Sequence, residues 1–297
     1  MRTRLLFATL LMSVACDPTL DTSTPDTDTG TDTASDSGTA SDTGTDSGTA
    51  TDSGTGTDSG TQGPDITELD PTCHPADPMF VAGFTRTYNV VSDLANSGTT
   101  SEGTEVQTGL GPSVAPSGTT VYAVQTALST TGDAVTATIY QSCFGGVAKV
   151  LEWEASITVG GQSKNVKATP SLAREYLPTV AELDAGTTWT YDYQLDIDAN
   201  LGMPLPITIP TSGTYTALAG KESITVAAGT FDAWKITNVF DQARDSGTMG
   251  QFSDISGSAI YWYVEGLGLV KEETLDANTG AVIMTKELAS FTGLSPV

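Results

Sequence analysis

Basic and metal-binding residues are scarce in this chain of 297 residues. It has 12 Lys and Arg against 36 Asp and Glu, a formal charge of −24, one His and three Cys. A chain this acidic repels phosphate backbones, which excludes nucleic-acid binding by a basic surface. We also expect no zinc site of the usual four-ligand kind from so few ligands, and no other cofactor.

Catalytic sequence motifs are missing as well. The chain contains no Gly-x-Ser-x-Gly, Ser-x-x-Lys or His-Glu-x-x-His pattern and no phosphate-binding loop. Its one histidine, His74, lies beside Cys73 without a convincing catalytic partner. We therefore expect a protein that is not an enzyme.

The first sixteen residues have the layout of a secretory signal. Two arginines precede the apolar run 5–12, which is too short to span a bilayer. The small residues Ser13-Val14-Ala15 before Cys16 resemble the lipobox of bacterial lipoproteins, in which the cysteine is lipidated. We expect residues 1–16 to be a lipoprotein signal peptide and the membrane to be a partner through Cys16. The alternative is an ordinary signal peptide with a chance cysteine.

Residues 17–70 have a composition that cannot form a packed core. Between Asp21 and Thr61 every residue is Asp, Ser, Thr or Gly except for one proline and three alanines. Without large apolar side chains, nothing offsets the entropy of ordering the chain. This segment is therefore predicted to be a disordered tether. Its many hydroxyl groups would also suit O-glycosylation.

Residues 71–297 hold nearly all aromatic residues and form the expected globular domain. Once Cys16 is assigned to lipid, Cys73 and Cys143 remain. In an exported chain an even remainder suggests a disulfide between them. The alternative is two buried thiols.

Alternating apolar and polar residues predict β-strands throughout this domain. Leu151–Val159 and Trp189–Ile197 each have one apolar and one polar face, as in an antiparallel sheet packed on one side. Further strands are expected at Val121–Leu128, Ala134–Tyr140, Ser163–Ala168, Ile207–Ala217, Glu222–Val226, Phe231–Phe240, Ala259–Val264, Leu267–Leu275 and Val282–Ala289. Only Ser171–Ala181, which contains Pro178, could form a short helix. We predict a mainly-β fold, an antiparallel meander that is open or curled into a half-barrel.

Two stretches of this domain carry a family resemblance. Residues 220–236 read Gly-Lys-Glu-Ser-Ile-Thr-Val-Ala-Ala-Gly-Thr-Phe-Asp-Ala-Trp-Lys-Ile, and residues 261–273 read Tyr-Trp-Tyr-Val-Glu-Gly-Leu-Gly-Leu-Val-Lys-Glu-Glu. With Asp184–Trp189 before them, over roughly 140–290, they resemble bacterial envelope proteins of the DUF3108 family. The resemblance implies a curved sheet similar to the half-barrels of LolA and LolB. It supplies no nucleophile, base or metal ligand.

The aromatic side chains of Trp234, Tyr261, Trp262 and Tyr263 could line a ligand groove, or they could be ordinary core. The leading hypothesis is an envelope lipoprotein, a monomer, that presents a non-enzymatic domain for binding or structural support. A carrier of a lipid or other apolar ligand is the alternative, and a carboxylate-based glycan hydrolase is a third. Asp17 resembles an inner-membrane retention signal of enteric bacteria. The long tether nevertheless favours the outer membrane or the cell surface.

Overall fold

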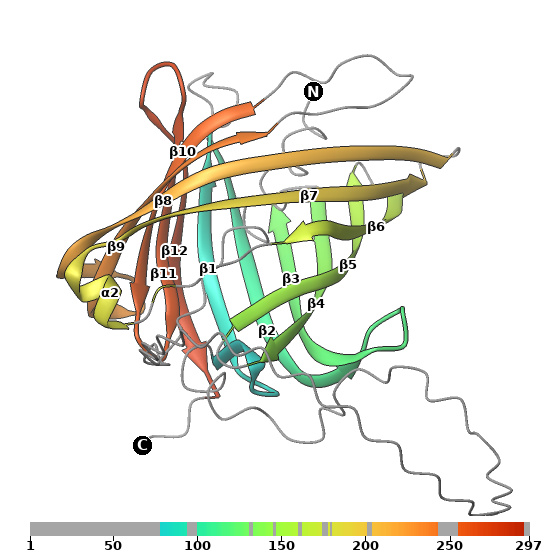
Figure 1. Ribbon diagram of the computed structural model, residues 1–297, viewed down its shortest axis with the longest axis horizontal. Helices are drawn as coiled ribbons and strands as arrows, with labels where there is room; N and C mark the ends of the chain where they lie inside the picture. The colour runs from blue at the N-terminus through green and yellow to red at the C-terminus, as the bar shows by residue number, and fades with distance from the viewer. Residues whose placement is uncertain are drawn as a thin grey trace, which may run out of the picture. The chain divides into compact units, whose positions relative to one another are not determined.

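The computed structural model describes most of the expected globular domain (Figure 1). The described residues are 78–93, 100–130, 133–144, 147–159, 162–173, 178, 180–200, 204–242 and 255–293. The signal segment with Cys16, the tether, Cys73, His74 and the side chain of Cys143 lie outside them. Lipidation and the disulfide therefore stay predictions.

Most of the described residues lie in β-strands. A short 3-10 helix, η1 (Pro78–Phe80), precedes the first strand, and a six-residue helix, α2 (Val180–Ala185), lies between the sixth and seventh. The strands are β1 (Thr85–Ser92), β2 (Ser101–Val114), β3 (Thr120–Thr130), β4 (Asp133–Phe144), β5 (Val147–Val159), β6 (Gln162–Ala173), β7 (Thr188–Asn200), β8 (Pro204–Val226), β9 (Gly229–Gln242), β10 (Ile255–Val264), β11 (Gly268–Asp276) and β12 (Val282–Thr292). Within the described ranges, no helix has the length and apolar character needed to cross a membrane.

The strands pair antiparallel in chain order, which confirms the mainly-β meander. β1 pairs with β2 on one side and with β12 on the other, so the hydrogen-bonded ladder is a closed barrel. The sequence predicts an open sheet or a half-barrel, whereas the hydrogen-bonded strands of the structure form a closed ring. Closure matters because an unpaired edge strand is a template for pairing with other chains.

Alternation of side chains explains which face of each strand is buried. In β5 the side chains of Trp153, Ala155 and Ile157 are buried, while Glu154 between them is partly exposed. Because successive side chains of a strand point to opposite faces, this pattern places the apolar positions on one face, as the sequence predicts.

β8 is one strand where the sequence predicts two. Ala217 pairs with Ile236 of β9, and Lys221 pairs with Trp234, so two extra residues of β8 form a bulge. Gly220 lies in this bulge with φ of +76°, a backbone angle that glycine adopts without strain. The expectation of a break between Ala217 and Glu222 is therefore wrong: the glycine marks an irregularity inside the strand.

The expected helix at Ser171–Ala181 is also wrong in position. β6 continues to Ala173, and α2 begins only at Val180. A proline disfavours helical angles in the residue before it, so Pro178 separates the two elements.

Two strands, β1 and β2, were not predicted. β2 contains Gly109, Gly111 and Pro112, and its pairing with β3 shifts between the two glycines. A β-carbon at Gly109 would collide with the carbonyl oxygens of Met79 and Val81, so η1 packs directly on this bulge. Glycines that serve close packing obscure the alternating pattern of the strand.

Candidate functional site

The four aromatic residues of the expected groove lie in packed clusters. Trp234, Tyr261 and Tyr263 belong to one cluster with Trp189 and Tyr215, and Trp262 belongs to another. Alternation along β10 explains the division, since Trp262 points away from its two tyrosine neighbours. All four side chains are at most 5% exposed. The four side chains therefore pack among other buried hydrophobic residues.

Each of the two tryptophans is fixed by its indole nitrogen and by a lysine. Trp234 Nε1 donates a hydrogen bond of 2.7 Å to Asp184 Oδ1 in α2, and Lys221 Nζ lies 4.0 Å from its ring centroid. Trp262 Nε1 donates to Glu222 Oε1 at 2.6 Å, with Lys235 Nζ at 5.2 Å from its ring. Such contacts satisfy the polar end of a buried ring and hold it in one orientation.

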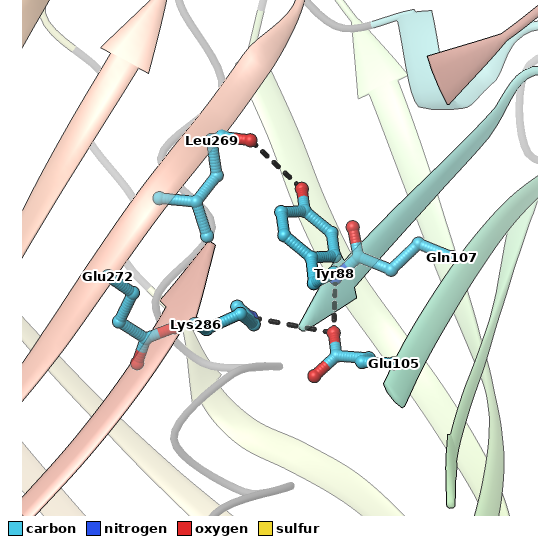
Figure 2. A network of polar contacts seen from close by, with 6 residues as sticks. All are labelled: Tyr88, Glu105, Gln107, Leu269, Glu272 and Lys286. Carbon is cyan, nitrogen blue, oxygen red and sulfur yellow. Dashed lines mark hydrogen bonds and ion pairs between the residues drawn. The ribbon is translucent and has the colours of Figure 1, made fainter. Parts of the chain in front are cut away.

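Ion pairing within the barrel centres on Lys286 of β12. Its Nζ lies 3.4 Å from Glu105 Oε1 of β2 and 3.1 Å from Glu272 Oε2 of β11 (Figure 2). The three side chains are at most 3% exposed. Buried charges persist in proteins when they are paired in this way, and we call these three residues the ion network.

Neighbouring polar groups complete the surroundings of the ion network. Gln107 Nε2 donates to Glu105 Oε1 at 2.8 Å. The ring of Tyr88 lies 5.2 Å from Lys286 Nζ, and its hydroxyl donates to the carbonyl oxygen of Leu269 at 2.9 Å (Figure 2). Hydrogen bonds of this kind orient the charged groups in a medium of low dielectric constant.

The ion network keeps Lys286 charged. Burial by itself would lower the pKa of this ammonium group, but attraction to Glu105 and Glu272 outweighs it, so the pKa is raised above the ordinary lysine value. Lys286 is therefore a cation at neutral pH.

Arg86 of β1 is a second buried cation, and with Lys286 it matches the two buried anions Glu105 and Glu272. Its Nη1 donates to the carbonyl oxygen of Leu267 at 3.1 Å. Among the described residues the buried charged side chains are Arg86, Lys286, Glu105 and Glu272, two cations and two anions. The two charges of each sign cancel, so the described part of the interior carries no net formal charge.

Among the residues that the structure describes, some buried polar atoms have no hydrogen-bond partner. They include Gln107 Oε1, Thr274 Oγ1, Thr211 Oγ1 and Trp153 Nε1. Unsatisfied buried polar atoms are uncommon in native proteins and often indicate a water molecule or a ligand.

The sequence interpretation missed the ion network. The available signal was a charge at an apolar position of an alternating strand: Lys286 stands between Met284 and Leu288, which are both buried. Arg86 stands between Phe84 and Tyr88 in the same way. A charge at such a position must find a buried partner, but the sequence does not say which one.

The described residues contain no group of three or more His, Cys, Asp or Glu side chains that could hold a metal ion. The carboxylates of Glu105 and Glu272 both pair with Lys286, and both are buried. Acid–base hydrolysis of a glycan needs two carboxyl groups that flank an accessible bond, which this arrangement does not provide.

One part of the chain, within its C-terminal third, matches a family model. Residues 214–288 match the model of the DUF3108-like family. No curated protein matches the chain.

Two solved structures show a weak likeness. A protein of Bacteroides fragilis described as exported, with a YmcC-like fold, is 12% identical with a TM-score of 0.34, over 71% of this chain and 96% of its own. A protein of Parabacteroides distasonis described as a lipoprotein is 12% identical with a TM-score of 0.31, over 71% and 95%.

The family match includes the two stretches that carried the expected resemblance, 220–236 and 261–273, whereas Asp184–Trp189 lies outside it. It begins inside β8 and ends inside β12. Residues 214–288, which match the DUF3108-like model, thus lie within a longer antiparallel ladder.

Proposed function

We propose that this chain is a lipid-anchored protein of the bacterial cell envelope whose β-rich domain is a non-enzymatic module for binding or structural support. The observation that carries the proposal is the burial of large side chains that alternation places on the inward face. Trp153, Trp234, Tyr261 and Tyr263 are each at most 2% exposed. Side chains packed in this way support a rigid presenting domain.

Lipid attachment at Cys16 is tested by replacing the cysteine. The intact mass of the wild-type protein should include a lipid, and the protein should sediment with membranes. The Cys16→Ala variant should lack the lipid and leave the membrane fraction. Ser13→Leu, which brings the segment closer to a usual lipobox, should still be lipidated. A Cys16→Ala variant that stays on membranes would contradict the anchor.

A second candidate function is the carrier of a lipid or other apolar molecule. It is favoured by the unpartnered buried atoms Gln107 Oε1, Thr274 Oγ1, Thr211 Oγ1 and Trp153 Nε1, since a bound molecule could supply their missing hydrogen bonds.

Native mass spectrometry distinguishes the two functions. The presenting module should have the mass of the lipidated chain alone. A carrier should retain an additional small molecule that organic solvent extracts. Such a molecule in stoichiometric amount would replace the first proposal by the second.

A further inference from the structure

The pairing of β1 with β12, which we call the seam, differs from every other strand pairing in the described ladder. All other paired strands follow one another along the chain, whereas Thr85 of β1 pairs with Thr292 of β12. The seam can therefore part without separating strands that are consecutive in the chain. It also contains a register shift between Thr87 and Tyr88.

Side chains hold the seam by reaching across a whole strand. Lys286 of β12 reaches past β1 to Glu105 of β2. Tyr88 reaches past β12 to the carbonyl oxygen of Leu269, and Arg86 reaches in the same direction to that of Leu267. Each of these contacts joins residues 181 apart in the sequence. Two of the three use a buried cation.

We propose that the ion network of Glu105, Lys286 and Glu272 is a charge-controlled latch on the seam, closed while the two carboxylates are ionised and released when they are protonated. This goes beyond the proposed function, because a seam that opens would expose the inward faces of the strands in acid conditions.

Charge balance explains why the latch responds to acid. Protonation of Glu105 and Glu272 would leave Lys286 as a buried cation without a counter-ion. Breaking a buried ion pair from one side is far more costly than replacing both partners by neutral groups. The unpaired ammonium group of Lys286 would then be more stable in water than in the interior. Lys286 lies in β12, and separation of β12 from β1 would let water reach it.

The groups that face Lys286 come from each strand near it. They are Glu105 of β2, Glu272 of β11 and the phenol of Tyr88 on β1. Arg86, also on β1, is always protonated and adds a positive charge to the same interior. The anionic side chains that face Lys286 are therefore the two glutamates.

Amide hydrogen exchange of the full-length protein tests the latch, with rates corrected for the intrinsic effect of pH. In acid we expect exchange in β1 and β12 to accelerate by about tenfold, while β4 and β5, which are consecutive strands, change little. The Glu105→Gln/Glu272→Gln variant imitates the protonated carboxylates and should show the same faster exchange already at neutral pH.

A triple variant is the matched control. Glu105→Gln/Glu272→Gln/Lys286→Met removes the cation as well, so its seam should stay protected at both pH values. Three results would overturn the latch: unchanged exchange at the seam in the double variant, an equal loss of protection in all strands, or a triple variant that still responds to acid.

Discussion

At the scale of single residues, Lys286 and Gly268 show how strongly the interior constrains the sequence. Lys286 occupies a position that the alternation of β12 gives to apolar side chains, and only the carboxylates of Glu105 and Glu272 make it tolerable. Gly268 has φ of +80°, and a β-carbon there would collide with Arg86 Nη1. Lys286 needs the carboxylates of two other strands, and Gly268 must stay small because the guanidinium group of Arg86 lies against it.

Replacing Gly268 tests the packing against Arg86. Gly266→Ala should lower the free energy of unfolding by about 1–2 kcal/mol, because φ there is +68° and nothing lies within 4 Å of the new β-carbon. Gly268→Ala has the same backbone strain and also displaces a buried guanidinium, so the loss should reach about 3 kcal/mol or more. Equal losses in urea unfolding would contradict this close approach.

Replacing Lys286 tests the ion network through pH. Lys286→Met leaves two buried carboxylates without a cation and should cost about 3–5 kcal/mol at neutral pH. Because the pKa of Lys286 is raised in the folded state, its contribution is fully present below the ordinary lysine value of about 10.4 and is lost only as pH rises through the folded value.

The difference between wild type and Lys286→Met should therefore be constant between about pH 7 and pH 9. It should shrink in acid, where protonation relieves the repulsion between the carboxylates of the variant. Urea unfolding at several pH values measures this difference. A difference that grows on acidification would contradict the ion network.

At the scale of secondary structure, α2 is a short helix held by one buried side chain and one acceptor. Leu183 is fully buried in the cluster that contains Trp234, and Asp184 accepts the hydrogen bond of that tryptophan. Helices this short have little stability of their own, so packing keeps α2 in place.

Truncating Leu183 tests this dependence. Leu183→Ala should lower the free energy of unfolding by about 2–4 kcal/mol, because it leaves a cavity in the cluster that contains Trp234. Ala181→Ser, at an exposed position of the same helix, should change it by less than about 0.5 kcal/mol. Thermal or urea unfolding compares the two, and similar losses would argue against Leu183 as the anchor.

The strands that the sequence predicts well are those with unbroken alternation, such as β5 and β7. β2 and the middle of β8 were harder, because their glycines serve bulges that depend on neighbouring strands and on η1. The ion network was harder still. The alternation of β12 reveals that Lys286 faces inward, but its partner Glu105 lies 181 residues away and becomes a neighbour only when the barrel closes.

At the scale of the whole barrel, closure depends on the last strand. β12 pairs with both β11 and β1, so its removal would leave two unpaired edges. Exposed edges of this kind promote pairing between molecules.

Truncation tests this role. A chain that ends at Asp276 lacks β12 and should form oligomers or aggregates, as measured by size-exclusion chromatography with light scattering. A chain that ends at Gly293 retains all twelve strands and should stay in the same oligomeric state as the full-length protein. A shorter chain that remains monomeric and folded would contradict the role of β12 in closure.

The pairing of Thr85 with Thr292 also sets the order of events during synthesis. A ribosome releases the chain from its N-terminus, so one side of β1 waits unpaired until the final strand has emerged. Contacts between such distant segments form late and slowly, and they leave partly folded chains open to aggregation. A chain interrupted before β12 therefore cannot close its barrel.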